Sequence, residues 1–273
     1  MKKENDQGEL EMVAKTATDI LLAFDRLPDN PDKLILSRRV KEQLKNDGVV
    51  TLSVFGCLDW IKSKLFTSTP EEFIADSVRN SDLFMPRVPK INELTKKMQS
   101  NGIATNVYVI LGDTDVREYF EMILNTANVF LKKEKLSERI QKYIFAFTDR
   151  VQKAILTPSE TILWSDTQNL FNEIETFIPE EISQESLDSM IRAYTGDSYK
   201  GLYLKPEDDV FLKANQKRID MYSKQGVMVD QMLNGIVLQT ETPWVLSSKL
   251  LKLNSPNLPI IYPWIRKKEL GTI

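Results

Sequence analysis

The chain has 273 residues, of which 42% are hydrophobic and 27% are charged, and its net charge is −3. This composition is typical of a soluble globular protein with a sizeable core, and it argues against a uniformly basic nucleic-acid-binding protein. No apolar run reaches the roughly 18 residues that a membrane-spanning helix needs. The polar N-terminus predicts no secretory signal, and the single cysteine, Cys57, excludes an intramolecular disulfide framework, so we expect a cytoplasmic protein.

The sequence contains no histidine. This removes histidine-based catalytic triads and histidine-ligated zinc or iron sites. Proton transfer would have to use carboxylates, tyrosine, lysine, water or the substrate itself. Any metal would be a hard ion held by carboxylates.

Two apolar runs in the first half of the chain predict buried strands. Residues 49–55 form a run of β-favouring residues that ends at Gly56, and residues 106–111 form a second run that ends at Gly112. Apolar residues at helical spacing, with Pro and Gly at the breaks, predict helices around these strands. These helices cover residues 9–26, 32–46, 58–79 and 90–100.

The second half of the chain is rich in helical patterns. We expect strands at 161–164 and at 258–263, where Pro259 indicates an edge strand or a strand start. Helices are expected over residues 116–155, 167–178, 183–194 and 207–240. The order of strand, helix and strand predicts an α/β chain with a Rossmann-like, mostly parallel sheet flanked by helices. We expect a single domain over residues 1–273, with an N-terminal helical segment at 9–46.

Ser53 lies near the carboxyl end of the first expected strand. In open α/β sheets the chemistry is found where the carboxyl ends of the strands open into loops. Ser53 is therefore a candidate nucleophile. The alternative is a hydrogen-bonded and inert hydroxyl, which is the common state of a serine in an apolar strand.

Asp113 and Asp115 follow the second expected strand. Two carboxylates at this spacing can hold a divalent metal ion against a phosphate. Either residue could instead cap the helix that follows.

A basic stretch covers residues 132–153, with seven basic and three acidic side chains and a net charge of +4. Such a helix face could bind phosphates with salt-dependent affinity. The alternative is a solvated face with ion pairs between residues four positions apart. The candidate phosphate-binding residues are Lys132, Lys133, Lys135, Arg139 and Lys142.

Three further side chains could take part in chemistry. Glu241 lies among apolar neighbours, which would raise its pKa toward a useful range, although a surface position at a helix end is the more common case. Tyr262 could donate or accept a proton at the end of the last strand, or could be a core ring. Cys57 lacks a histidine to activate it, which favours a buried thiol.

In their order, these segments resemble the tRNA-dependent cyclodipeptide synthases, which are Rossmann-type enzymes similar to class I aminoacyl-tRNA synthetases. Residues 51–56 resemble the context of the family's nucleophilic serine, with Ser53 in its place. The basic stretch stands where the family has a tRNA-binding helix. The segment ending in Glu241-Thr242-Pro243 resembles the family's tyrosine–glutamate helix, and Tyr262 falls where the family has a tyrosine–histidine pair. Val237 and Pro263 stand where the family has that first tyrosine and the histidine.

The resemblance implies a transferase. An aminoacyl-tRNA would dock by its phosphates on the basic helix, and Ser53 would become an aminoacyl-enzyme. Glu241 would then hold the incoming amino group, and Tyr262 would orient it or relay a proton. No metal or cofactor is needed, because the tRNA ester is already activated. Two alternatives are a metal-dependent transferase that acts on a nucleotide-linked substrate through Asp113 and Asp115, and a non-catalytic relative that binds without turnover.

Overall fold

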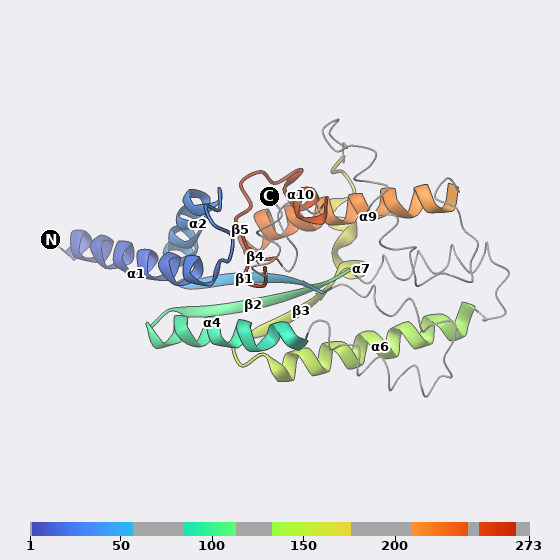
Figure 1. The fold of residues 1–273 in the computed structure, drawn as a ribbon, viewed down its shortest axis with the longest axis horizontal. Helices are drawn as coiled ribbons and strands as arrows, with labels where there is room; N and C mark the ends of the chain where they lie inside the picture. The colour runs from blue at the N-terminus through green and yellow to red at the C-terminus, as the bar shows by residue number, and fades with distance from the viewer. Residues whose placement is uncertain (1, 57–84, 113–132, 176–208, 240–245, 266–273) are drawn as a thin grey trace.

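Five parallel strands form one sheet in the order β3-β2-β1-β4-β5 (Figure 1). The computed structural model describes residues 2–56, 85–112, 133–175, 209–239 and 246–265. The strands are β1 (Val49–Gly56), β2 (Ala104–Leu111), β3 (Ser159–Leu163), β4 (Ile236–Leu238) and β5 (Ile260–Ile261). The chain builds the sheet outward from β1 in one direction and later adds β4 and β5 on the other side. This doubly wound order confirms the predicted α/β, Rossmann-like sheet.

Each strand directs alternate side chains to the two faces of the sheet. We call the face that carries Leu52 and Ile236 the first face, and the face that carries Ser53 and Val237 the second face. Leu52 and Ile236 belong to one buried apolar cluster, and Val237 belongs to another. Both faces are covered, which is why the strands read as nearly continuous apolar runs.

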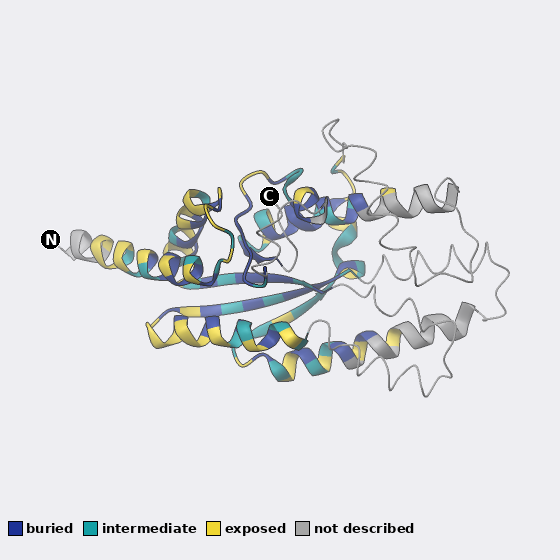
Figure 2. Cartoon of the chain, viewed as in Figure 1, coloured by how far each residue is buried: buried dark blue, intermediate teal, exposed yellow. Residues whose placement is uncertain are grey.

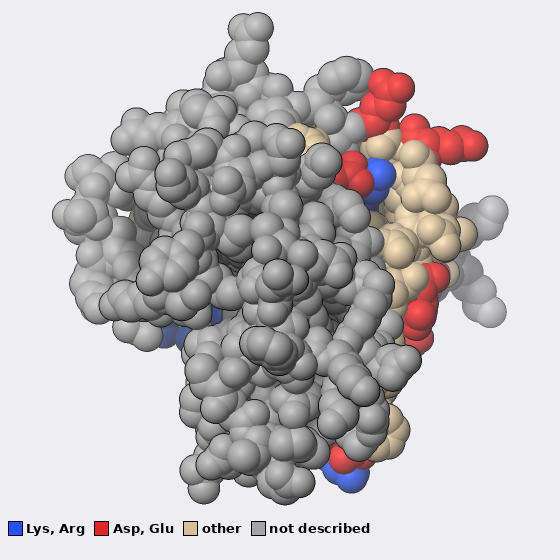
Figure 3. Space-filling model, turned by 90° about the vertical axis from the view of Figure 1, so that its right-hand side faces the viewer, with Lys and Arg blue, Asp and Glu red and all other residues tan. Residues whose placement is uncertain are grey.

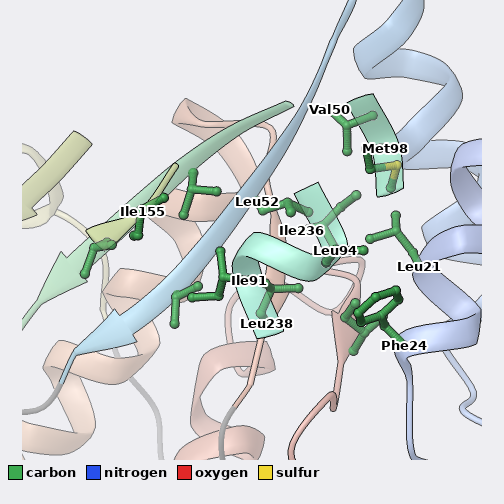
Figure 4. Packing of buried hydrophobic residues seen from close by; sticks show 14 of the residues in the cluster. Leu21, Phe24, Val50, Leu52, Ile91, Leu94, Met98, Ile155, Ile236 and Leu238 are labelled. Atoms are coloured by element: carbon green, nitrogen blue, oxygen red, sulfur yellow. The ribbon is translucent and has the colours of Figure 1, made fainter. Parts of the chain in front are cut away.

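The first face packs against α1 (Lys2–Phe24), α4 (Val88–Ser100) and α6 (Lys133–Ala154). Figure 4 shows this core, in which side chains of α1 and α4 meet the strands. The helices contribute Leu21, Phe24, Ile91, Leu94 and Met98, and the strands contribute Val50, Leu52, Ile236 and Leu238. The buried sides of these helices face the sheet and their outer sides are exposed (Figure 2), as the predicted amphipathic patterns require.

The second face packs against α9 (Asp209–Val227), the π-helix η6 (Met228–Met232) and α10 (Leu246–Lys252). Shorter elements add to this layer, namely α7 (Trp164–Thr167) and η4 (Gln168–Phe171). Trp164 and Phe171 stack with their ring centroids 5.7 Å apart. The remaining elements are α2 (Lys33–Asn46) and the 3-10 turn η3 (Met85–Arg87).

The loop between α1 and α2 anchors the edge strand β5. Asn30 donates from Nδ2 to Asp25 Oδ2 at 2.5 Å and to the carbonyl oxygen of Ile260 at 2.8 Å. The buried carboxylate of Asp32 pairs with Lys252 of α10 and accepts the backbone N–H of Ile260 at 3.1 Å. The N-terminal segment therefore connects α10 to the last strand.

The predicted helix over residues 207–240 is wrong at its C-terminal end. The helix ends in η6, and Ile236–Leu238 is a strand between β1 and β5. Asn234 has φ of 46°, which breaks the helical path before Gly235. A short apolar run such as 236–238 cannot be told from a buried helix segment by its periodicity, and here pairing with two strands makes it β.

The predicted helix over residues 167–178 is also wrong in part. Its place is taken by α7 and η4, which together end at Phe171. The predicted strand over 161–164 begins earlier and ends at Leu163, because Trp164 opens α7. The helices expected over 58–79 and 183–194 lie outside the described residues, as does the first part of the helix expected over 116–155.

Gly226 lies where α9 crosses α10. A methyl group added there would lie 1.9 Å from the carbonyl oxygen of Leu251. We expect Gly226→Ala to lower the free energy of unfolding by at least about 2 kcal/mol, because backbone must move to relieve the overlap. Urea unfolding would measure this change.

Gly8→Ala is the matched control, because Gly8 also lies in a helix but has nothing within 4 Å of the added methyl. It should raise the stability by up to about 1 kcal/mol through helix propensity. Equal effects of the two substitutions would contradict the close approach of α9 to α10.

Candidate functional site

Ser53 lies in the middle of the sheet on its second face. Its register partners are Tyr108 on β2 and Val237 on β4. Val237 in turn pairs with Ile260, two residues before Tyr262. Ser53 and Val237 therefore lie on neighbouring strands and on one face, and Tyr262, just past the end of the next strand, shares one buried cluster with Val237. These are three of the positions that the family resemblance singled out.

The hydroxyl of Ser53 is buried and unpaired. Its exposed fraction is 0%, and Oγ has no hydrogen-bond partner among the residues that the structure describes. A buried hydroxyl without a partner costs about 1–3 kcal/mol of stability, so its presence needs an explanation. A methyl group added to Gly235 would lie 2.9 Å from this oxygen and 2.8 Å from Cγ1 of Val229. The turn after η6 therefore covers Ser53.

A buried polar cluster holds that turn in place. Arg39 of α2 donates from Nη1 to the carbonyl oxygen of Asp230 at 3.0 Å and to Asn234 Oδ1 at 2.8 Å, and its Nη2 pairs with the carboxylate of Asp230. Gln43 donates to the carbonyl oxygen of Asn234 and accepts the N–H of Thr51 on β1 at 3.3 Å. Helix α2 thus fixes the turn that covers Ser53 against the strand that carries it.

Tyr262 follows β5, and its backbone is held at both ends. Its N–H donates to Asp25 Oδ1 at 3.2 Å, and its carbonyl oxygen accepts the N–H of Arg26 at 3.2 Å. Burial raises the pKa of the Tyr262 hydroxyl well above its usual range, and the carboxylates of Asp32 and Asp25 raise it further. The hydroxyl therefore stays protonated at neutral pH, where it can donate a hydrogen bond.

Two glycines form the carboxyl edge of β1 and β2. Gly112 directly follows β2, and its N–H donates to the carbonyl oxygen of Gly56 at 3.3 Å. Gln225 of α9 lies beside this edge, because a methyl group added to Gly112 would lie 3.8 Å from Gln225 Nε2. The sequence analysis missed Gln225, since a glutamine within a helical pattern gives no sign of which way it faces.

The other candidate residues are placed only in part. Lys133, Lys135, Arg139 and Lys142 lie in α6, which confirms the helix expected for them. Near its end Lys153 pairs with Asp149 at 2.8 Å, and both side chains are exposed. Lys132, Glu241, Asp113, Asp115 and Cys57 lie outside the described residues.

Figure 3 views the side of the molecule from which α6 and α9 start and toward which the strands' carboxyl ends point (Figure 1). The described residues visible there lie mainly along one rim and include both acidic and basic side chains.

A cavity of about 420 Å³ lies at the opposite, amino end of β2. Its walls come from the end of α4, the start of β2 and the loop before β3. Its lining residues are Thr95, Gln99, Gly102, Ile103, Ala104, Thr105, Asn106, Leu156, Thr157 and Pro158. It carries no charged side chain among these and is remote from the carboxyl ends of the strands.

Within the described ranges, no three His, Cys, Asp or Glu residues gather as metal ligands would. In the same ranges, no helix has the length and apolarity needed to cross a membrane.

Comparison with known proteins gives a distant structural likeness. No protein-family model matches the chain, and no curated protein does. Among solved structures, the chain is similar to "structure of a CDPS from Fluoribacter dumoffii", a cyclodipeptide synthase. The identity is 10%, the alignment covers 78% of this chain and 89% of that one, and the TM-score is 0.43.

Ser53→Ala removes a buried hydroxyl that has no partner. We expect it to leave the free energy of unfolding unchanged or to raise it by about 1 kcal/mol, because no hydrogen bond is lost and an unsatisfied group is removed. Thermal and urea unfolding would measure this change.

Ser223→Ala is the contrasting variant, because Ser223 is equally buried but its Oγ accepts Asn254 Nδ2 at 2.9 Å. It should lower the stability by about 1 kcal/mol. A larger loss in Ser53→Ala than in Ser223→Ala would contradict the unpaired state of Ser53.

The raised pKa of Tyr262 predicts a loss of stability at alkaline pH. An unfolded tyrosine loses its proton near pH 10, whereas the folded Tyr262 keeps its proton to higher pH. Above pH 10 the folded state therefore binds more protons than the unfolded state, and stability falls by up to about 1.4 kcal/mol per pH unit.

Tyr262→Phe should remove this part of the alkaline loss. Urea unfolding of the two proteins at pH 8, 10 and 11 would compare their slopes, which should agree up to pH 9 and separate above pH 10. Parallel curves across the whole range would contradict the raised pKa.

Proposed function

We propose that this protein is an aminoacyl transferase of the cyclodipeptide-synthase type, with Ser53 as the acyl-accepting nucleophile. The observation that carries the proposal is the placement of Ser53 and Val237 as register partners on β1 and β4, with Tyr262 directly after the next strand, β5, and in the same buried cluster as Val237. The resemblance had singled out these positions from segments about 180 and 25 residues apart. Motifs matched by chance would have no reason to meet in the fold.

The reaction needs no cofactor. The Ser53 hydroxyl oxygen attacks the carbonyl carbon of an aminoacyl-tRNA ester, the bond to the ribose oxygen breaks, and that oxygen takes up the proton lost by Ser53. The amino group of a second aminoacyl-tRNA then attacks the seryl ester, which forms a peptide bond and restores the Ser53 hydroxyl. The free amino group of the resulting dipeptidyl-tRNA attacks its own ester carbonyl, which closes the ring, and the ribose oxygen of the second tRNA leaves with the proton that the amine loses. Tyr262, protonated at neutral pH, would serve as a hydrogen-bond donor rather than a base. Glu241 is the proposed holder of the incoming amino group.

The proposal requires a movement. Ser53 is covered by Gly235, so an ester can reach Oγ only if the turn after η6 shifts away from β1. A π-helix in this position fits that requirement, because π-helical turns are often found at functional sites. The docking of tRNA phosphates is proposed for the basic residues of α6, and its strength should fall with salt.

Two observations favour a second candidate, a relative that binds without turnover. Ser53 has no exposed surface, and Val237 stands where the family has a tyrosine. A valine cannot donate or accept a proton beside the nucleophile. A protein that keeps the sheet but has lost the chemistry would show both features. The metal-dependent alternative rests on Asp113 and Asp115 alone.

Intact mass spectrometry of the purified protein, with an extract of the expressing cells analysed beside it, tests the proposal. The wild type should show a mass excess equal to one aminoacyl group, and the extract should contain a cyclic dipeptide. In Ser53→Ala the mass excess should vanish and the product should fall at least about 100-fold, because no other group replaces the nucleophile.

Ser255→Ala is the matched control, because Ser255 is also buried with an unpaired Oγ but lies after α10, away from the row that contains Ser53. It should keep both the adduct and the product. A wild type without adduct or product, which nevertheless binds tRNA in a salt-dependent manner, would refute the transferase and support the binding protein.

A further inference from the structure

Gln225 carries an unpaired amide group at the carboxyl edge of the sheet. Only 1% of its surface is exposed, and its Nε2 has no hydrogen-bond partner among the described residues. Leaving a buried amide N–H without a partner costs about 1–3 kcal/mol. Native structures contain few such groups, and each one calls for an explanation such as a bound ligand.

The unpaired amide lies beside Gly112 and the end of the Met221 side chain, whose Cε and Sδ atoms lie 3.2 and 3.3 Å from the position of a methyl group on Gly112. Nε2 lies 3.8 Å from the position that a methyl group on Gly112 would take, and Gly112 is partly exposed. The neighbouring strand also ends in a glycine, Gly56, whose carbonyl oxygen accepts the Gly112 N–H. Glycines allow a ligand to approach the backbone closely. This edge is also where ligands bind in open α/β sheets.

We infer that the Gln225 amide binds a hydrogen-bond acceptor on the nucleoside end of the substrate, an aminoacyl-adenosine, seated on the edge formed by Gly56 and Gly112. This inference rests on the proposed function for the identity of the substrate, and it extends that function to a residue outside the row of Ser53, Val237 and Tyr262.

The spacing along β1 supports a long substrate. Ser53 lies three residues before Gly56, which is about 10 Å along a strand at roughly 3.3 Å per residue. A ligand that reaches from the Ser53 hydroxyl to the glycine edge is longer than a free amino acid. An amino acid esterified to a ribose has this reach, and its ribose and base carry neutral oxygen and nitrogen acceptors that suit an uncharged amide donor.

The experiment measures binding without chemistry. The probe is an adenosine that carries its amino acid through an amide in place of the ester, so that Ser53 cannot be acylated. Its affinity for the full chain is measured by isothermal titration calorimetry. The variants are Gln225→Met, which keeps the size and removes the donor, and Gln99→Met, the same change at an exposed site on α4. Melting temperatures are recorded for all three proteins.

We expect the wild type to bind the probe, Gln225→Met to bind about tenfold more weakly, and Gln99→Met to stay within about twofold of the wild type. The melting temperature of Gln225→Met should be unchanged or higher, because the amide has no internal partner to lose. A purely structural glutamine would give the opposite result, a lower melting temperature.

Three results would overturn the inference. They are a wild type that does not bind the probe, an unchanged affinity in Gln225→Met, and a clearly lowered melting temperature in that variant. If the probe binds with the expected dependence on Gln225 while the wild type forms no adduct at Ser53, the inferred binding site is supported and the proposed acyl transfer is refuted. Failure of the inference can therefore be distinguished from failure of the proposed function.

Discussion

The buried carboxylate of Asp32 joins the N-terminal segment to α10 and β5, whose bonded residues lie 220 and 228 positions further along the chain. It lies at the start of α2, pairs with Lys252 of α10 and accepts the backbone N–H of Ile260 in β5. A buried ion pair of this kind costs about 3–5 kcal/mol when one partner is lost, because the other charge stays buried and uncompensated. The strand that it holds has only two residues, which is too short to be stable by its own pairing. The place of Tyr262 beside β4 therefore depends on a residue of the N-terminal segment.

The central strands could be predicted from the sequence, and the strand β4 could not. The β1 and β2 runs are eight residues long, rich in valine, and each is followed by a turn signal, so local sequence and final structure agree. Residues Ile236–Leu238 follow a long helical pattern with too few residues to show a period of their own. Their strand form comes from pairing with β1 on one side and β5 on the other, which is information held elsewhere in the chain.

In the candidate site, too, some features could be predicted from the sequence and others could not. A family resemblance carried by short motifs was enough to single out Ser53 and Tyr262, and the sheet brings their strands close. It could not predict that Gly235 covers Ser53, because that contact depends on how the turn after η6 packs. Nor could it find Arg39, whose partners in and beside η6 lie 191 and 195 residues away. Such features follow from which side of a helix faces the sheet, and they become visible only once the layers are assembled.

The order of the strands has a consequence for how the chain is made. β1 gains one neighbour from β2 soon after it is synthesised, but its other neighbour, β4, is 184 positions further on at the pair of Ser53 and Val237. Until that segment leaves the ribosome, one edge of the central strand has no partner. An unpaired strand edge of this kind is a site of mispairing and aggregation. Because the central strand is completed only by the last quarter of the sequence, chains that stop early should depend on chaperones far more than the finished protein does.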